Sequence, residues 1–467
     1  MKETVIERMQ RVDANRRIAD FMAKEKQPYP FKRNYARIRA REFVRECDKR
    51  DLNYHVSVGG LDSIVLFLFL RSIGIYAPGV TASHLEDASI QRVHKALGLE
   101  RVKSAIRKDG KPWTKATIIQ EFGFPVLSKE VAAKIELLEH PSEKNKTVRH
   151  AIITGETGEY GGNRAESRMK LAQKWLELFA GYENENEGVN YKIAPFQVSS
   201  KCCYYLKEKP CDDWAREHNS VPFLGLMASE GGRRAKSLRI NGCNYFGKST
   251  IRSAPFAIFH RQDILTLALE MDEYYLKHWQ EFNPNPAAKV ESIIPAIYGE
   301  IARREDGTLY TTKAQRTGCS MCGFGIHMEQ RPHRFDLLRE RNRKEWEFWM
   351  YRCCTDPDTG ERYGWGRVLD WIGVPWRDLP DGNFEDQCCL WGGSNHGKTE
   401  TEETSQQAPR RGRELRQAAD SPATDESCIP AEHAAGALAH RVQHSRCVSH
   451  RPNADAARLL SSPTREL

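Results

Sequence analysis

One stretch of the sequence decides the fold: His55-Val56-Ser57-Val58-Gly59-Gly60-Leu61-Asp62-Ser63. Its first residues form a short β-type run, and the apolar run at residues 64–70 predicts a buried helix directly after the glycines. Glycines let the backbone approach an anion, and amides at a helix N-terminus can bind it, although such turns also occur without a ligand. The Asp62 carboxylate could order the loop or hold a metal ion on the phosphates. The candidate phosphate-binding residues are Ser57, Gly59, Gly60, Asp62 and Ser63.

Short β-type runs of this kind alternate with helical patterns in the sequence that follows. The strand candidates are residues 55–58, 79–82, 151–154 and 223–226. Strands that alternate with helices form a parallel sheet, so we expect an α/β fold with helices on both faces of the sheet.

Changes in the hydrophobic pattern divide the chain into expected parts. Apolar residues at helical spacing predict amphipathic helices near the N-terminus, and the hydrophobic pattern is lost near residue 394. The expected parts are an N-terminal helical extension at 1–50, a nucleotide-binding domain at 51–270, a cysteine-bearing, cluster-binding helical subdomain at 271–390 and a disordered tail at 391–467.

The chain has 467 residues, 13 cysteines and a formal net charge of +8. Many cysteines without an N-terminal apolar segment indicate a reducing compartment, where thiols serve metals or catalysis, so we expect a cytoplasmic protein. The longest apolar run is too short to span a membrane, so we expect no membrane partner. The positive charge fits an anionic nucleotide ligand and permits nucleic-acid binding without requiring it.

Two cysteine doublets lie far apart in the sequence, Cys202-Cys203 and Cys319-Ser320-Met321-Cys322. Four thiolates from two segments match the donor set of a tetrahedral, sulfur-rich metal site. A zinc knuckle, a redox dithiol and a pair of buried small residues remain alternative interpretations. Cys243 is an alternative ligand, because two adjacent cysteines are difficult to place on one cluster.

The loop at residues 57–63 resembles that of the PP-loop, or adenine nucleotide alpha hydrolase-like, proteins, which reads Ser-Gly-Gly-x-Asp-Ser. Gly59, Gly60, Asp62 and Ser63 match this pattern. Val58 stands where the family has its first serine. Leu61 occupies the variable position of the pattern, where reductases of the family usually have lysine. The resemblance implies that the loop binds the phosphates of an adenine nucleotide.

Further segments narrow the resemblance to the phosphoadenosine phosphosulfate reductase family. Residues 123–130, Gly-Phe-Pro-Val-Leu-Ser-Lys-Glu, are similar to that family's GxPxxSKE segment. The resemblance implies that Glu86 lies near the nucleoside and that Gly155 belongs to the nucleotide site. It also implies that arginines hold the sulfate end, because guanidinium groups bind oxyanions in a bidentate manner. The implied sulfate-binding residues are Arg164, Arg168, Arg233 and Arg234.

The two cysteine doublets are similar to the iron–sulfur signature of assimilatory adenylyl-sulfate reductases. This resemblance implies an iron–sulfur cluster of the 4Fe-4S type. The implied ligands are Cys202, Cys203, Cys319 and Cys322.

The resemblance implies an oxidoreductase that cleaves adenylyl sulfate or phosphoadenylyl sulfate with a dithiol donor such as thioredoxin or glutaredoxin. Reductases of this family attack the sulfonate with a cysteine in a Glu-Cys-Gly-Leu-His motif, which this sequence does not contain. The alternative is an ATP-pyrophosphatase-type enzyme that uses Mg²⁺ and activates a substrate for sulfur transfer, as in nucleic-acid thiolation or DNA phosphorothioation. A nucleotide or cluster sensor without turnover is a third hypothesis.

Overall fold

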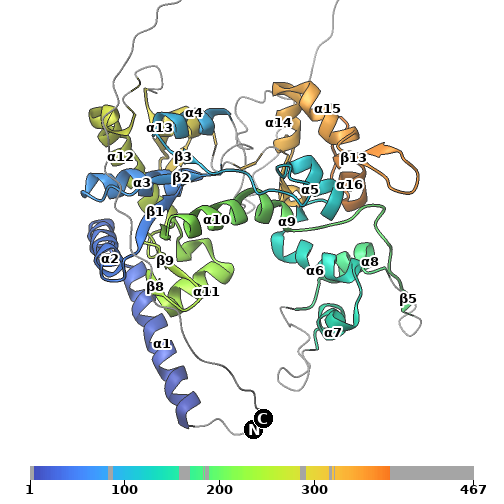
Figure 1. Cartoon of the computed structure of the whole chain (residues 1–467), viewed down its shortest axis with the longest axis horizontal. Coiled ribbons are helices and arrows are strands. Elements are labelled where there is room, and N and C mark those ends of the chain that lie inside the picture. The colour runs from blue at the N-terminus through green and yellow to red at the C-terminus, as the bar shows by residue number, and fades with distance from the viewer. Residues whose placement is uncertain are drawn as a thin grey trace, which may run out of the picture. The chain divides into compact units, whose positions relative to one another are not determined.

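The structure of this protein is a computed structural model that describes residues 5–82, 88–156, 169–181, 183–184, 189–283, 285, 291–314, 318–319 and 321–378 (Figure 1). The expected disordered tail at 391–467 lies outside these residues, as do Glu86, Arg164 and Arg168. Among the described residues, no helix combines the length and the apolar character that crossing a membrane requires.

A six-stranded sheet in the described part of the chain has the order β3-β2-β1-β7-β9-β8. Its strands are β1 (Asn53–Ser57), β2 (Gly79–Thr81), β3 (Glu100–Arg101), β7 (Ser220–Phe223), β8 (Asn244–Phe246) and β9 (Ile251–Ser253). Neighbouring strands are parallel except for the antiparallel pair of β8 and β9. The expected α/β fold with a largely parallel sheet flanked by helices is therefore confirmed.

The strand predictions at residues 55–58 and 79–82 are confirmed by β1 and β2. The prediction at residues 223–226 is displaced, because β7 ends at Phe223 and the following residues lead into the short helix η3 (Ala228–Glu230). The prediction at residues 151–154 is wrong, because these residues end helix α7 (Lys146–Thr154). A run of four apolar residues does not distinguish a strand from the buried side of a helix.

The first hydrophobic cluster surrounds the six-stranded sheet and draws its buried side chains from residues 21–97 and 223–309. Helix α3 is buried on all sides, because every residue from 64 to 70 is shielded from solvent. The helices of this part are α1 (Val5–Glu25), α2 (Tyr29–Lys49), α3 (Leu61–Ser72), α4 (Ala88–Ala96), α11 (Gly232–Asn241), α12 (Arg261–Phe282) and α13 (Ile293–Tyr298). A hairpin of β10 (Ile301–Arg303) and β11 (Leu309–Thr311) follows them.

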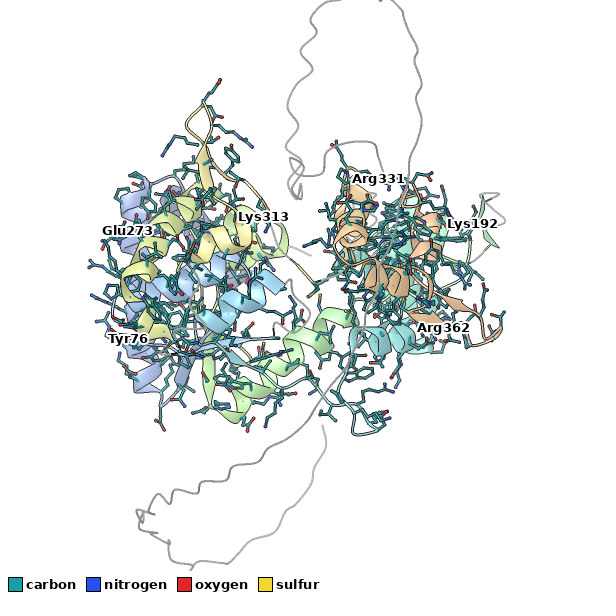
Figure 2. All side chains as sticks on the ribbon, turned by 90° about the horizontal axis from the view of Figure 1, so that it is seen from above. Tyr76, Lys192, Glu273, Lys313, Arg331 and Arg362 are labelled. Atoms are coloured by element: carbon teal, nitrogen blue, oxygen red, sulfur yellow. The ribbon has the colours of Figure 1, made fainter. Side chains whose placement is uncertain are left out.

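A second hydrophobic cluster draws its buried side chains from residues 119–198 and 321–376. Its longer helices are α5 (Lys115–Phe122), α6 (Lys129–Glu139), α7, α8 (Gln173–Phe179), α14 (Arg334–Arg341), α15 (Arg343–Tyr351) and α16 (Trp365–Ile372). Its short elements are β4 (Val126–Leu127), β5 (Glu183–Asn184), β6 (Val189–Asn190), β12 (Gly323–Phe324), β13 (Cys354–Thr355), β14 (Arg362–Tyr363), η1 (Glu143–Asn145) and η5 (Ile326–Met328). In Figure 2, Tyr76, Glu273 and Lys313 label the part with the first cluster, and Lys192, Arg331 and Arg362 label the part with the second.

The two clusters interleave along the sequence, because the chain leaves the first cluster after residue 97 and returns to it at residue 223. A helix made of α9 (Lys201–Cys203), the π-helical turn η2 (Tyr204–Glu208) and α10 (Lys209–Glu217) leads back to β7. The expected domain boundary at residue 270 falls inside α12. Parts that are contiguous in the fold are therefore not contiguous in the sequence.

A buried ion pair fixes the start of α12 against α2. The Lys32 ammonium lies 2.7 Å from the Asp263 carboxylate, and both side chains are almost completely buried. The same carboxylate accepts a hydrogen bond from the backbone N–H of His260 at 2.7 Å and so caps α12. These contacts set the position of Arg261, the first residue of the helix.

Candidate functional site

The predicted phosphate loop lies where the order of the sheet reverses. From β1 the chain proceeds outward through β2 and β3, whereas β7 lies on the opposite side of β1. In open α/β sheets, ligands bind outside the carboxyl ends of the strands at such a reversal. Gly225, just after β7, packs directly on the loop, because a Cβ atom there would lie 2.8 Å from the backbone carbon of Asp62 and nitrogen of Ser63. The segments after β1 and β7 therefore meet.

The loop is held by its own serine. The Ser63 hydroxyl accepts a hydrogen bond from the backbone N–H of Gly59 at 2.8 Å and donates one to the carbonyl of Gly60 at 2.9 Å. The backbone N–H of Leu61 donates to the buried hydroxyl of Tyr298 in α13 at 2.6 Å. A phosphate that binds the amide of Gly59 must therefore displace the Ser63 hydroxyl from it.

Two buried histidines support the same loop. The Nε2–H of His94 in α4 donates to the carbonyl of Gly59 at 2.8 Å, and Nδ1 then accepts from the Thr81 hydroxyl at 3.2 Å. The Ser57 hydroxyl, at the end of β1, lies 3.4 Å from Nε2 of His55. Burial lowers the pKa of His55 to about 4, so this imidazole is neutral at physiological pH.

An arginine from a distant segment supplies a cation at the loop. The Arg261 guanidinium lies 3.3 Å from the Asp62 carboxylate, and the two side chains are 37 % and 27 % exposed. Residues 57–63 contain no lysine or arginine, so Arg261 provides a positive charge that the local sequence lacks. A guanidinium at this position can bind a phosphate in a bidentate manner.

The space above the loop is open at Gly59. A Cβ atom built there meets no heavy atom within 4 Å, and the backbone of this residue lies outside the left-handed region. The protein without a ligand therefore does not need glycine at this position, whereas close approach of a phosphate to the backbone does.

We predict that Gly59→Ala changes the free energy of unfolding by less than about 1 kcal/mol but weakens nucleotide binding by about tenfold or more, because the methyl group occupies the phosphate position. Thermal unfolding and calorimetric titration with ATP measure the two effects. Gly318→Ala is the matched control, since Gly318 also has open space and no positive φ. Equal nucleotide affinity in both variants would contradict a phosphate site at this loop.

Of the other candidate nucleotide and sulfate residues, the structure describes the side chain of Arg234 and the backbone of Gly155. The Arg234 guanidinium, which is 58 % exposed, contacts both carboxylate oxygens of Glu230 at 3.0 and 3.1 Å. Gly155 caps α7 with a φ of 85°, and this helix packs in the second cluster. The backbone of Arg233 lies in α11, but its side chain lies outside the description, as do Glu86, Arg164 and Arg168.

The four cysteines of the two doublets lie near one another. The pKa of Cys202 is raised to about 12 and that of Cys203 to about 11, mainly by burial and to a smaller extent by the charges of Cys319 and Cys322. These charge effects link thiols from segments more than a hundred residues apart in the sequence. In their present side-chain positions, the described residues form no group of three or more ligands that could hold a metal ion.

The elements around these cysteines are unusual in their backbone geometry. Cys203 immediately precedes the π-helical turn η2, a type of helix that is frequent at functional sites. Met321, inside the Cys-x-x-Cys turn, has a φ of 52° although it is not glycine, and it is buried in the second cluster. The backbone N–H of Cys322 donates to the carbonyl of Cys319 at 3.3 Å and closes this turn. A strained residue at a thiol-bearing turn is compatible with a functional role.

Residues 123–130 connect the two cysteine segments. Strand β4 pairs in parallel with β12, which begins directly after Cys322. Lys129 forms an ion pair with Glu208 of η2, and its charge lowers the pKa of Cys203. The same segment approaches residues 197–198, because a Cβ atom at Gly123 would lie 2.3 Å from the carbonyl of Gln197. The segment similar to GxPxxSKE therefore positions the thiols in this structure.

Cys243 lies apart from the other four cysteines. Its thiol donates a weak hydrogen bond to the Tyr35 hydroxyl at 3.9 Å within the first cluster. Burial raises its pKa to about 11, and none of the other four cysteines contributes to that change. The geometry therefore favours Cys202 and Cys203 over Cys243 as partners of the Cys-x-x-Cys turn.

A buried carboxyl lies next to the segment that leads into α9. Glu139, at the end of α6, accepts a hydrogen bond from the backbone N–H of Val198 at 3.0 Å. Burial raises its pKa to about 8, with a smaller contribution from the neighbouring Glu136. Because the folded state keeps this proton and the unfolded chain releases it, the stability that Glu139 contributes is lost as the pH rises from about 4.5 to about 8.

We predict that Glu139→Gln stabilises the protein at pH 8 relative to the unchanged chain, by on the order of 2–4 kcal/mol, and has little effect at pH 5. The amide keeps the acceptor for Val198 but cannot lose a proton. Denaturant unfolding at both pH values measures the difference, with the exposed Glu121→Gln as control. Parallel stability curves for the two variants would show that Glu139 is not the titrating group.

Comparisons of the chain with protein-family models, with curated proteins and with solved structures found no match. The sequence predicts the phosphate loop and the four cysteine ligands, and these stay predictions; it does not point to His94, Arg261 and Tyr298, which contact the loop. These three residues come from helices that follow the loop in the sequence, and no local motif marks them.

Proposed function

We propose that this chain is an enzyme of the adenine nucleotide alpha hydrolase-like type that binds adenylyl sulfate or phosphoadenylyl sulfate. The loop at residues 57–63 would hold the phosphate, and Arg261 would supply the cation beside it. The observation that supports the proposal is that residues 123–130 contact both cysteine segments, through the pairing of β4 with β12 and the ion pair of Lys129 with Glu208. Four thiols in one region fit the donor set of a [4Fe–4S] cluster.

The proposed reaction is reductive cleavage of the sulfonucleotide. A thiolate attacks the sulfur of the sulfonate, the S–O bond to the nucleotide breaks, and AMP or its 3′-phosphate leaves with the electron pair. A dithiol donor such as thioredoxin then releases sulfite and is itself oxidised to a disulfide. Cys202, Cys203, Cys319 and Cys322 would hold the cluster, which when bound would polarise or orient the substrate. The phosphate loop and Arg261 hold the leaving phosphate, whose charge increases as the bond breaks.

One observation favours a second candidate function, the ATP-dependent one. Burial raises the pKa of Cys47, Cys211 and Cys243 to about 11, so none of these described thiols is an activated nucleophile. An enzyme that adenylates a substrate with ATP and releases pyrophosphate needs no thiolate for that step. Asp62, beside the loop, would then hold Mg²⁺ on the phosphates, and the cysteine site would serve a later sulfur transfer.

Product analysis distinguishes the two functions. Full-length protein purified without oxygen is incubated either with adenylyl sulfate and reduced thioredoxin or with ATP and Mg²⁺. Release of AMP and sulfite from the first mixture supports the reductase, and release of AMP and pyrophosphate from the second supports the ATP-dependent enzyme. Binding of either nucleotide without product in both mixtures would overturn both proposals and leave a sensor.

A further inference from the structure

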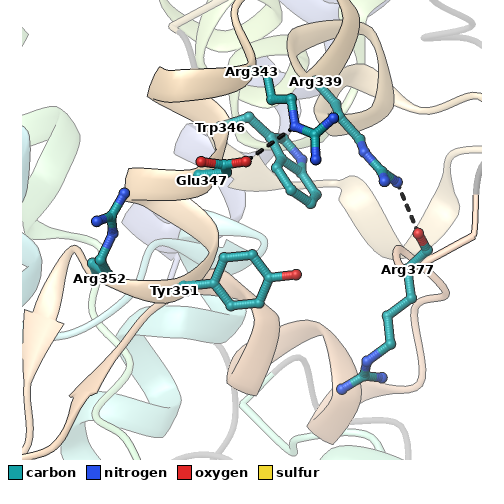
Figure 3. Close-up of a pocket in the computed structure, with 7 residues that line it drawn as sticks. All are labelled: Arg339, Arg343, Trp346, Glu347, Tyr351, Arg352 and Arg377. Atoms are coloured by element: carbon teal, nitrogen blue, oxygen red, sulfur yellow. Dashed lines mark hydrogen bonds and ion pairs between the residues drawn. The ribbon is translucent and has the colours of Figure 1, made fainter.

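A second hollow, far in sequence from the phosphate loop, is lined by cationic and aromatic side chains (Figure 3). It has a volume of about 440 Å³ and lies between α14, α15 and the residues that follow α16. Its lining residues are Arg339, Arg343, Trp346, Glu347, Tyr351, Arg352 and Arg377. Neither the phosphate loop nor the cysteine group contributes a residue to it.

The lining residues carry four guanidinium groups and one carboxylate, and the Arg377 guanidinium is also paired with the Asp370 carboxylate at 2.7 Å. Arg343 pairs with Glu347 at 3.0 Å, and both side chains are exposed. Arg352 is exposed, and its guanidinium makes no ion pair or hydrogen bond with any residue that the structure describes. Exposed ion pairs are weak, so a phosphate can replace Glu347 as the partner of Arg343 at a small cost in free energy. The same phosphate or its neighbour can bind the Arg352 guanidinium.

Aromatic rings stand beside these cations. Tyr351 is 48 % exposed, and its ring meets Trp346 edge to face at 5.8 Å and Trp376 at 5.5 Å. The Arg339 guanidinium lies 4.8 Å from the centre of the Trp346 ring. Packing against two tryptophans fixes the tyrosine while half of its surface stays accessible to a flat ligand.

The exposure of the lining residues indicates the class of ligand. Sites for small molecules are mostly apolar and enclose their ligand, whereas Arg343, Tyr351 and Arg352 are open to solvent. Open grooves that combine cations for a backbone with aromatic rings for bases are typical of single-strand binding. A duplex does not offer its base faces for stacking.

We propose that this hollow binds single-stranded nucleic acid, with phosphates at Arg343 and Arg352 and a base stacked on Tyr351. The site does not depend on nucleotide binding at the loop after β1. It therefore adds a nucleic-acid partner whichever reaction the phosphate loop supports.

Fluorescence anisotropy of the full chain with a labelled oligothymidylate of about 15 nucleotides tests the proposal at about 50 to 200 mM salt. Tyr351→Ala is expected to weaken binding about tenfold through loss of stacking, while Tyr351→Phe keeps the affinity. Arg352→Gln is expected to weaken binding several-fold and to reduce the slope of log affinity against log salt by about 0.7.

Arg45→Gln is the matched control, because Arg45 is also exposed and lies in α2, away from the hollow. An equal loss of affinity in the Arg45 and Arg352 variants would mean general attraction to a basic protein and would overturn the proposal. Equal affinity for the duplex of the same sequence would also overturn it, because stacking on Tyr351 would then play no part. Competition by ATP at the loop is not expected to change the oligonucleotide affinity.

Discussion

Arg261→Ala is expected to weaken the binding of adenylyl sulfate and ATP by about 10- to 100-fold, the effect of losing a charge-assisted hydrogen bond to phosphate. The guanidinium lies at the loop through its contact with Asp62. Residues 57–63 contain no lysine or arginine that could replace its charge. Calorimetric titration of the full chain with each nucleotide measures the loss.

Two variants control this result. Arg216→Ala removes an exposed arginine that is also ion-paired, with Asp213 at 3.0 Å, but lies in α10. Arg261→Lys keeps the charge and is expected to retain part of the affinity. The folded state should persist in both Arg261 variants, because the start of α12 is fixed by Lys32 and Asp263. If Arg261→Ala binds nucleotide as well as Arg216→Ala does, Arg261 is only a support for the Asp62 side chain.

Gly123→Ala is expected to lower the free energy of unfolding by about 3–5 kcal/mol, the sum of backbone strain and overpacking. Gly123 has a φ of 100° and a ψ of 177°, a conformation that is essentially restricted to glycine. Its Cβ atom would also lie 2.3 Å from the backbone of Gln197. Denaturant unfolding measures this loss of stability. The substitution also displaces the segment at Gln197 that leads to the first cysteine doublet.

Gly110→Ala separates the two causes. Gly110 has a φ of 80° but open space around its Cβ position, so its substitution should cost only the backbone strain, about 1 kcal/mol. A similar loss of stability in both variants would show that the approach to Gln197 is not a tight contact.

Local patterns predicted the elements that are defined by neighbouring residues. The strand, the glycine turn and the apolar helix at residues 55–70 follow one another without interruption, and the structure contains them in that order. The run at residues 151–154 misled because only Ala151 and Ile152 face the core, as one side of a helix. A short apolar run carries no signal that separates these two outcomes.

Residues that reach the loop from elsewhere could not be predicted. His94, Arg261 and Tyr298 each contact residues 59–62, but their sequence neighbourhoods contain only ordinary helical patterns. The interleaving of the two hydrophobic clusters could not be predicted either. It depends on which cluster a later segment of the chain packs against, and the composition of that segment does not determine this.

The two cysteine doublets, in contrast, are recognisable in the sequence although more than a hundred residues separate them. The two thiol pairs predict a common site, and the charges of Cys319 and Cys322 contribute to the raised pKa values of Cys202 and Cys203; the metal in that site stays a prediction. The spacing does not reveal the contacts that hold the two cysteine segments in place. These are the pairing of β4 with β12 and the ion pair of Lys129 with Glu208. These contacts explain why residues 123–130 belong to the same region.

Iron and acid-labile sulfide in the anaerobically purified full chain test the central claim most directly, beside Cys319→Ser and Cys243→Ser. The account predicts about four iron and four sulfide per chain, as in a [4Fe–4S] cluster, retained in Cys243→Ser and lost in Cys319→Ser. Zinc, no metal, or the same iron content in Cys319→Ser would contradict it.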